Sequence, residues 1–393
     1  MVQQLTVQFR AMERVYSGQP VAEALPAEVE RLGAQRVFLL VSRTLNHETD
    51  AIASVREALG HRCAGLYEGM PPHTPRDAVL EATEGARAAG ADLLVSIGGG
   101  SLTDAAKMVQ LCLAHDVRDV AGLDAYRIVV EADGSQHRPT LQPPPVRMVA
   151  VPTTLSGGDF NPLAGCTDHR IGVKQAFEHP LLVPRAVILD PAISVHTPEW
   201  VWLSTGMRAV DHAVEGLCSL ACNPYTEGAA RQALRLLGEG LRRSKARPDD
   251  LEGRQQCQLG MWLSMANREA GVPMGASHAI GHVLGGTCGV PHGYTSCVML
   301  PNVLRYNAAG SAANAERQAI VAEALGRPGE DAAQVVGDLI SALGLPRTLR
   351  DVGVGPERFR EVAEHSMHDR WIHTNPRPIK SPEEVLAILE MAA

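Results

Sequence analysis

Short apolar runs alternate with helical segments through the first half of the chain, and this alternation restricts the fold more than any other feature. Four runs have the length of a buried strand: Arg36–Val41, Asp92–Ile97, Val146–Val151 and Ala186–Leu189. They lack regular polar alternation, as strands do when both faces of their sheet are covered. Strands of this kind, separated by helices, predict a parallel sheet with helices on both sides.

Start and stop signals place helices between these runs. Gly33 ends a helical segment over Val21–Leu32, since glycine accepts the left-handed conformation of a helix terminus. A second helix is predicted over Thr74–Ala89, with its first residue as the N-cap and Pro75 at the first helical position. A third begins at Ser101, directly after a buried run.

From Thr197 onward the pattern changes to helical periodicity without strand-like runs. We therefore expect an α/β domain over residues 1–197 and an all-helical domain over residues 198–393. The polar segment Asp116–Pro145 is expected to leave the sheet as an excursion. The predicted fold class is α/β followed by all-α.

The overall charge restricts the partners. A formal net charge of −8 argues against a nucleic-acid or acidic-membrane partner. No stretch approaches the ~18–20 apolar residues of a membrane span, and the start has no signal-peptide core. We expect a cytoplasmic protein whose partner is a small-molecule substrate.

Three consecutive glycines, Gly98, Gly99 and Gly100, precede Ser101 where a predicted strand passes into a helix. Glycines allow a ligand to approach the backbone closely, and a helix N-terminus directs free N–H groups toward an anion. A tight turn alone would need about one glycine at such a position. The loop therefore indicates a phosphate-binding site, with a diphosphate as the natural occupant.

Four histidines form the second candidate site. His278 and His282 are one helical turn apart and share a helix face. His292 follows in a glycine-flanked loop, and His212 belongs to the first helix of the second half. A single histidine is more often structural, but imidazoles on facing helices can form a metal cage.

Four motifs carry a resemblance to a known family: GGGSLTDAAK at Gly98–Lys107, VPTTLSGGD at Val151–Asp159, GMRAVDH at Gly206–His212 and SHAIGHVLGGTCGVPHG at Ser277–Gly293. In content and order they resemble the iron-containing alcohol dehydrogenases. The second and fourth motifs, and the closing Asn375-Pro-Arg-Pro378, are more similar to the maleylacetate reductase branch. GGGSLTDAAK is more similar to the alcohol dehydrogenases.

This resemblance implies a Rossmann-like first domain, a helical second domain of the dehydroquinate synthase type, a substrate between them and a homodimer. The implied cofactor is NAD or NADP, with its diphosphate at the glycine loop. The implied cofactor-binding residues are Ser42, Arg43, Gly98, Gly99, Gly100, Ser101, Asp104, Thr153, Thr154 and Lys174.

The resemblance also implies a metal position, and this chain departs from the pattern there. In metal-dependent members an aspartate joins three histidines that match His212, His278 and His292, and His282 matches a further histidine near the nicotinamide. The aspartate position holds Arg208, whose guanidinium has no lone pair and repels a cation. No tightly bound metal is expected, as in maleylacetate reductases, which also lack this aspartate.

Two interpretations of Arg208 stay open. It turns to solvent or pairs with Asp211, or its guanidinium fills the vacated cation position and binds a substrate carbonyl or carboxylate. Iron or zinc would bind only if Asp211 replaced the missing ligand. That residue lies about 100° around the helix from His212, whereas position 208 shares its face.

Cofactor preference depends on the residue after the first predicted strand. NAD-preferring members carry an aspartate where this chain has Ser42 and Arg43. An acidic residue there repels the 2′-phosphate of NADP, and an arginine attracts it. The alternative is a solvated arginine at a loop tip, so we expect either cofactor to be usable.

The sequence predicts an NAD(P)-dependent oxidoreductase that acts on CH–OH, C=C or C=O groups. The leading hypothesis is hydride transfer from NAD(P)H to the carbonyl of an oxo-acid, such as maleylacetate from aromatic ring cleavage. Its candidate catalytic residues are Arg208, His212, His278, His282 and His292. One of His212, His278 and His282 would supply the proton, because histidine titrates near neutral pH.

Three alternatives remain: a metal-dependent dehydrogenase of primary alcohols, a dehydroquinate synthase-like lyase, and an inactive binding protein. The last is suggested by the loss of a ligand at Arg208 and by Asp159, which stands where the family has glutamate. The four retained histidines argue against inactivity.

Overall fold

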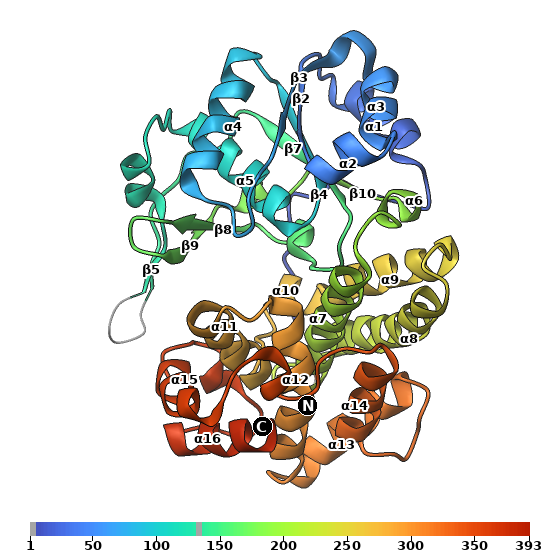
Figure 1. Ribbon diagram of the computed structural model, residues 1–393, viewed down its shortest axis with the longest axis vertical. Coiled ribbons are helices and arrows are strands. Elements are labelled where there is room, and N and C mark those ends of the chain that lie inside the picture. Colours follow the sequence, from blue (N-terminus) through green and yellow to red (C-terminus); the bar gives the residue numbers. More distant parts are fainter. Residues whose placement is uncertain (1–4, 131–135) are drawn as a thin grey trace. The chain divides into compact units, whose positions relative to one another are not determined.

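A computed structural model describes residues 5–130 and 136–393, and the chain divides into two compact units (Figure 1). The first unit is Phe9–Thr197, and Pro198–Ala393 belongs to the second. All strands of the described residues lie in the first unit, and the second contains helices alone. The fold class predicted from the sequence is confirmed.

Six parallel strands form the central sheet of the α/β unit, in the order β1-β10-β7-β4-β2-β3. Their bounds are Arg14–Ser17 (β1), Val37–Val41 (β2), Cys63–Glu68 (β3), Leu93–Gly98 (β4), Arg147–Pro152 (β7) and Ala186–Leu189 (β10). The four predicted strands are β2, β4, β7 and β10. The sequence analysis missed β1 and β3, which lie at the two edges of the sheet.

Helices cover both faces of this sheet, as expected (Figure 1). The bounds of these helices are Val21–Leu32 (α1), Arg43–Glu48 (α2), Ala51–Leu59 (α3), Arg76–Ala88 (α4), Gly100–Ala114 (α5) and Pro191–Ser194 (α6). Alternate residues of β2, β4, β7 and β10 form one buried cluster with the apolar sides of α1 and α3. Gly33 ends α1 with a φ of 71°, which is the left-handed conformation expected there.

The predicted start of the second helix is wrong. Thr74 does not cap α4, because its φ is 56° and its hydroxyl donates to the Ser101 carbonyl at 3.0 Å. Pro75 is the N-cap rather than the first helical residue, and it forms a bridge with Thr167. The tertiary contacts of the buried Thr74, and not its local sequence, therefore determine its conformation.

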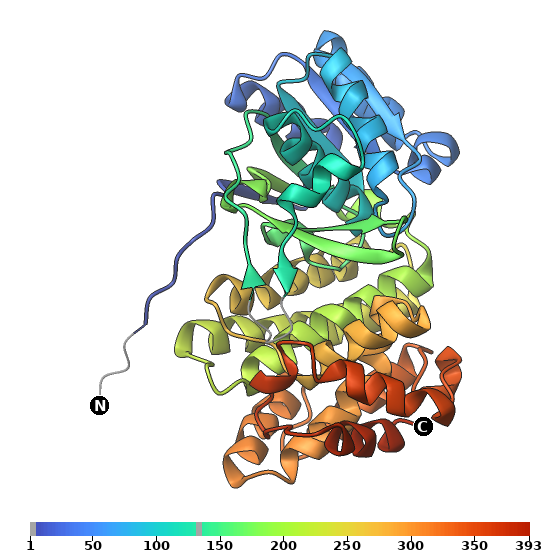
Figure 2. The same ribbon diagram turned by 90° about the vertical axis from the view of Figure 1, so that its left-hand side faces the viewer.

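The excursion after α5 contains a small two-stranded antiparallel sheet, β5 (Val129–Val130) with β6 (Gln136–His137). Residues 131–135 of the predicted excursion lie outside the described residues. A second antiparallel pair, β8 (Leu163–Asp168) with β9 (Val173–Glu178), was not predicted and is drawn as green arrows in Figure 2.

The second unit contains ten α-helices in the described chain. Their bounds are Glu199–Cys218 (α7), Pro224–Ala246 (α8), Leu251–Ser264 (α9), Ala266–Glu269 (α10), Ala276–Cys288 (α11), His292–Ala308 (α12), Ala312–Ala324 (α13), Ala332–Ala342 (α14), Phe359–Ser366 (α15) and Pro382–Met391 (α16). Apolar residues of α11, α12, α15 and α16 form one buried cluster. None of the helices in the described part of the chain combines the length and apolar character that a membrane crossing requires.

Asn375 of the closing NPRP segment supports the start of α11. Its Oδ1 accepts hydrogen bonds from the Ala276 backbone N–H at 3.2 Å and from Asn307 Nδ2 at 3.3 Å. Its Nδ2 donates to Asn307 Oδ1 and to the Arg377 carbonyl, both at 2.7 Å. One buried amide therefore joins three separate segments of the helical unit.

We predict that Asn375→Leu lowers the free energy of unfolding of the helical unit by about 1–3 kcal/mol, because buried polar partners lose their hydrogen bonds. Chemical denaturation followed by circular dichroism measures the change. Lys380→Ala is the control, since this exposed side chain lies in the same segment. An equal midpoint for both variants would contradict the assigned role of the amide.

Candidate functional site

The glycine loop joins β4 to α5. Gly98 needs to be glycine, because its φ is 154° and a Cβ would lie 2.4 Å from Leu102 Cδ1. Gly99 is the N-cap of α5 with an ordinary extended backbone, and a Cβ there would lie 3.3 Å from Thr154 Cγ2. A Cβ on Gly100 would lie 3.2 Å from Ser156 Oγ. The glycines therefore keep the N-terminus of this 15-residue helix bare, as an anion site requires.

The topology points to the same place. The chain passes from β2 outward to the edge strand β3, whereas β4 is followed on its other side by β7. The carboxyl ends of the neighbouring strands β2 and β4 thus mark the point where the strand order reverses, which is where open α/β sheets bind ligands. Ser42 follows β2 there, and its backbone N–H donates to the Ile97 carbonyl at 3.0 Å.

The structure brings most of the predicted cofactor residues to this region. The Thr153 N–H donates to the Gly98 carbonyl at 2.9 Å, and Thr154 lies beside Gly99. Lys174 Nζ lies 3.3 Å from Asp104 Oδ2, so these two residues form an ion pair. Arg43 is exposed and begins α2, so it lies at a helix start and not in an extended loop.

The sequence analysis gave no role to Lys107, the last residue of the GGGSLTDAAK motif. Its fully buried Nζ donates to the carbonyls of Gly158 and Leu163, at 2.7 and 2.8 Å, and burial lowers its pKa to about 8. One turn earlier, Thr103 Oγ1 donates to Asp159 Oδ1 at 2.5 Å. Asp159 is thus part of the α/β interior, and burial raises the pKa of its carboxyl group.

The four histidines come from three helices of the second unit. His212 lies on α7, His278 and His282 on α11, and His292 is the first residue of α12 rather than a loop residue. The rings of His212 and His278 stack with centroids 4.9 Å apart. Those of His282 and His292 are 6.1 Å apart, edge to face. The predicted histidines therefore form two adjoining pairs.

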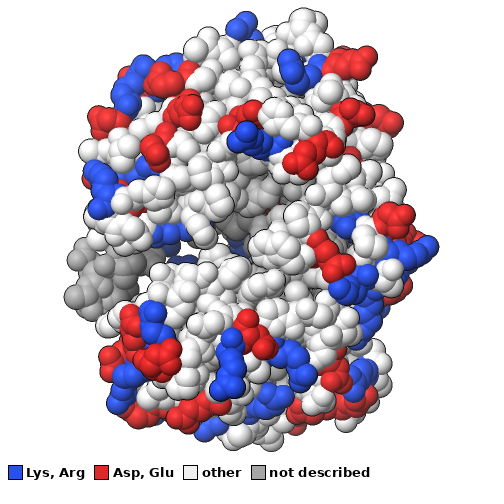
Figure 3. Space-filling view, in the orientation of Figure 1, with Lys and Arg blue, Asp and Glu red and all other residues white. Residues whose placement is uncertain are grey.

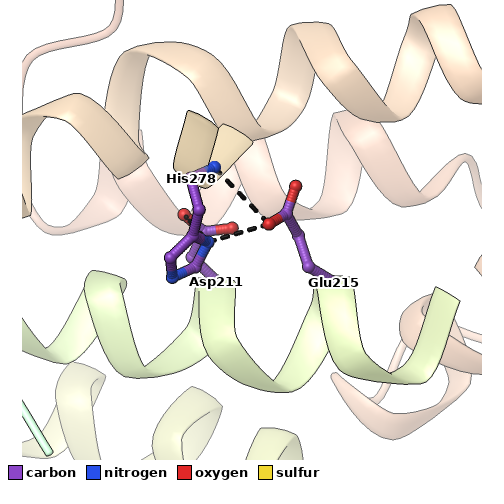
Figure 4. Close-up of side chains that lie close together, drawn as sticks. All are labelled: Asp211, Glu215 and His278. Carbon is purple, nitrogen blue, oxygen red and sulfur yellow. Dashed lines mark hydrogen bonds and ion pairs between the residues drawn. The ribbon is translucent and has the colours of Figure 1, made fainter. Parts of the chain in front are cut away.

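Glu215 holds His278 in place, and the sequence analysis missed it. Its Oε2 lies 2.8 Å from His278 Nδ1 (Figure 4). The same oxygen accepts the Gly275 backbone N–H at 2.8 Å. Its Oε1 accepts the Ser277 N–H, also at 2.8 Å. A buried carboxylate thus satisfies the free N–H groups at the start of α11 and leaves His278 Nε2 as the available ring nitrogen.

Arg208 is buried and paired. Its Nη1 donates to Ser296 Oγ at 3.1 Å and lies 3.7 Å from Asp211 Oδ2. The same Asp211 oxygen accepts the hydroxyls of Ser296 at 2.6 Å and Ser277 at 2.9 Å. The pairing with Asp211, which belongs to the first interpretation, is present, and its other form, an arginine turned to solvent, is excluded by the 9% exposure of Arg208. The second interpretation, a guanidinium that binds substrate in the vacated cation position, stays a prediction.

Burial and the arginine charge set the protonation of this group. Burial is the main cause that holds the pKa values of His212 and His278 well below the usual range, and the positive charge of Arg208 is the second cause. Burial raises the pKa of Asp211 to about 6, against the lowering effect of Arg208. Burial and the neighbouring Asp211 charge raise the pKa of Glu215 to about 8. Both imidazoles are therefore neutral at physiological pH.

These residues do not fit a tightly held divalent ion. His278 Nε2 and His212 Nδ1 are buried without a hydrogen-bond partner among the described residues, so both nitrogens are available to a ligand. However, Arg208 acts on both rings with its positive charge, and no carboxylate completes the set. One possible metal-donor atom from each of Asp211, Glu215 and His278 lies within 4.8 Å of the other two. However, Asp211 Oδ2 already accepts serine hydroxyls, and Glu215 Oε2 already forms a hydrogen bond with His278 Nδ1.

His282 has a different environment. Its Nδ1 lies 2.8 Å from Asp369 Oδ2, and its side chain is 36% exposed. Trp371 packs on its ring with centroids 4.9 Å apart, and the guanidinium carbons of Arg268 and Arg370 lie 4.8 and 5.0 Å from the Trp371 ring centre. Asp369 and Trp371 were not predicted, because nothing local in the sequence links them to α11.

Two family models match the chain: iron-containing alcohol dehydrogenase over residues 12–191, and the C-terminal part of that family over residues 202–393. The dehydrogenase ALT3 of Alternaria alternata is 35% identical, and the match covers 92% of this chain and 99% of that protein. The chain belongs to the iron-containing alcohol dehydrogenase family.

Further relatives place this iron-containing alcohol dehydrogenase in the maleylacetate reductase-like branch. Maleylacetate reductase 1 of Cupriavidus pinatubonensis is 31% identical over 94% of this chain and 92% of its own length. The crystal structure of maleylacetate reductase from Agrobacterium tumefaciens matches with a TM-score of 0.82 and 27% identity, covering 100% of this chain and 98% of that one. The protein is therefore an NAD(P)-dependent oxidoreductase.

We predict that Gly99→Val raises the dissociation constant of this dehydrogenase for NAD(P)H at least tenfold, or about 1.4 kcal/mol. The backbone at Gly99 accepts any residue, so the fold should persist while the added methyl groups crowd the diphosphate position. Fluorescence titration with NADH and NADPH measures binding. Gly228→Val, at an open position on α8, is the control. Unchanged NAD(P)H binding by a folded Gly99→Val variant would contradict the assignment of the diphosphate to this loop.

Proposed function

We propose that this enzyme reduces the carbonyl group of an oxo-acid with NADH or NADPH and needs no bound metal ion. The observation that carries the proposal is the buried Arg208 guanidinium, held by Ser296 and Asp211 beside the histidine group. Similarity to several maleylacetate reductases supports an oxo-acid as the substrate class. Metal, where family members use it, polarises the reacting oxygen; here Arg208 supplies a fixed positive charge instead.

The roles of the histidines follow from their environments. His212 and His278 are neutral and buried, so they suit hydrogen bonding to the substrate better than proton donation. His282 is partly exposed and has a carboxylate partner, which suits a group that exchanges protons with solvent. In the proposed reaction a hydride adds to the carbonyl carbon, and His282 gives a proton to the oxygen.

A specific observation favours one second candidate, a metal-dependent alcohol dehydrogenase. Three imidazoles remain, and Asp211, Glu215 and His278 lie close enough together to hold an ion if their hydrogen bonds were exchanged.

The main proposal includes a homodimer and a cytoplasmic location. On the face drawn in Figure 3, acidic and basic side chains are intermixed, which agrees with a small-molecule partner.

NAD(P)H oxidation against a panel of oxo-acids and simple aldehydes, before and after EDTA treatment, tests the proposed function. We expect turnover of oxo-acids and no loss of rate on chelation. Activity restricted to simple aldehydes or alcohols, lost with EDTA and regained with zinc or iron, would establish the second candidate instead.

Changing the charge at position 208 should restore metal affinity. We predict that Arg208→Asp binds zinc more tightly than wild type, because it removes a buried positive charge and adds a carboxylate one turn from His212. This variant should lose at least tenfold of the metal-free reductase rate. Elemental analysis after dialysis against zinc gives the stoichiometry, with exposed Arg242→Asp as the control. Stoichiometric metal in the wild type would contradict the account.

Cofactor preference gives a separate prediction. Arg43→Asp should lower kcat/KM for NADPH at least tenfold more than for NADH, since only NADPH carries the 2′-phosphate. Arg56→Asp makes the same charge change at an exposed position on α3 and should leave the ratio unchanged. Equal effects of Arg43→Asp on both cofactors would show that this arginine only faces solvent.

A further inference from the structure

The segment Asp369-Arg370-Trp371 contacts His282 on two sides. Asp369 Oδ2 lies 2.8 Å from His282 Nδ1, and the Trp371 ring packs on the imidazole with centroids 4.9 Å apart and planes 38° apart. Asp369 lies 87 residues after His282 in the sequence. These two contacts fix the orientation of the His282 ring. Nε2 is then the ring nitrogen that remains for a contact with a ligand.

Asp369 is itself fixed. Its second oxygen, Oδ1, accepts the Trp371 backbone N–H at 2.9 Å, and its own N–H donates to the Ser366 carbonyl at 3.1 Å, just past the end of α15. Arg268 and Arg370 lie against Trp371, with guanidinium carbons 4.8 and 5.0 Å from its ring centre. Contacts within the protein thus orient the carboxylate toward His282.

We propose that Asp369 is the positioning residue of His282: it keeps a proton on Nδ1 and so leaves Nε2 as the atom that exchanges a proton with the substrate. A carboxylate that accepts a hydrogen bond from Nδ1 selects this tautomer. This inference rests on the proposed function. Glu215 has a similar contact with His278, but that pair is buried and so lacks contact with solvent protons.

The proposed step balances as follows. A hydride from the dihydronicotinamide forms the new C–H bond, and the π electrons of the carbonyl move to its oxygen. That oxygen takes a proton from Nε2 of the His282 imidazolium, which returns to the neutral ring with its Nδ1–H still donated to Asp369. The cofactor is oxidised, the carbonyl is reduced to an alcohol, and solvent reprotonates Nε2.

Kinetics of Asp369 variants test the inference. Asp369→Asn removes the charge but keeps the size, so kcat should fall at least tenfold while KM for NAD(P)H stays within about twofold. Asp369→Glu should recover part of kcat. Asp338→Asn, at a carboxylate on α14 paired with Arg327, is the control and should have no effect. Equal losses for Asp369→Asn and Asp369→Glu would contradict the inference.

A double variant separates positioning from general destabilisation. If Asp369 acts through His282, adding Asp369→Asn to His282→Gln should lower kcat no further than His282→Gln alone, since residues that act as a unit are not additive. Additive losses would overturn the inference.

A readout without substrate separates this inference from the proposed function. Nitrogen-15 NMR of the protein as purified, with the His282 signals assigned by their absence in His282→Gln, should show that Nδ1 stays protonated and that the neutral form of the ring is the Nδ1–H tautomer. Asp369→Asn should shift the population toward Nε2–H. An Nε2–H tautomer in the wild type would overturn the inference, whereas an unreactive protein with the Nδ1–H tautomer would contradict the reaction alone.

Discussion

The buried contact between Arg208 and Asp211 determines what the helical site can do. Arg208 stands on the face of α7 that carries His212, and its Nη1 reaches Asp211 directly at 3.7 Å and through Ser296 at 3.1 Å. An unpaired charge in a buried position costs several kcal/mol of stability. Each of the two charged side chains therefore depends on the other. A Cβ on Gly281 would lie 3.7 Å from Nη1, which shows how closely α11 approaches the guanidinium.

A second buried carboxylate connects this ion pair to the scaffold. Glu215, one turn beyond Asp211 on α7, receives the backbone N–H groups of Gly275 and Ser277 at the start of α11. Asn375 receives the intervening N–H of Ala276. The orientation of His278 is therefore set by α7 and by the NPRP segment together. One turn further along α11, Asp369 holds His282.

Local sequence signals predicted much of the fold. The bounds of α1 and β10 were predicted exactly, because a glycine stop and a short unbroken apolar run depend on neighbouring residues only. Thr74 fails as a cap because its hydroxyl contacts Ser101, 27 residues away. The edge strands β1 and β3 carry weaker apolar patterns: Arg14 in β1 is exposed, and the other residues of both strands are half-buried.

The candidate site was only partly predictable. Motif spacing indicated the glycine loop and the histidines, which the structure brings together in their respective units. Glu215 and Asp369 were missed because each acts on a histidine 63 or 87 residues away, and an isolated acidic residue carries no signal of such a contact. Lys107 was missed because a lysine on a helix is usually exposed.

A double-mutant cycle on the unfolding free energy tests the central claim most directly. Arg208→Met leaves Asp211 as a buried unpaired carboxylate, and Asp211→Asn leaves the guanidinium unpaired, so each should destabilise the helical unit by about 3–5 kcal/mol. The double variant is neutral at both positions and keeps an acceptor for the two serines. It should be more stable than the sum of the single losses by about 2–3 kcal/mol. Additive losses would show that the two residues are not coupled and would contradict this account of the site.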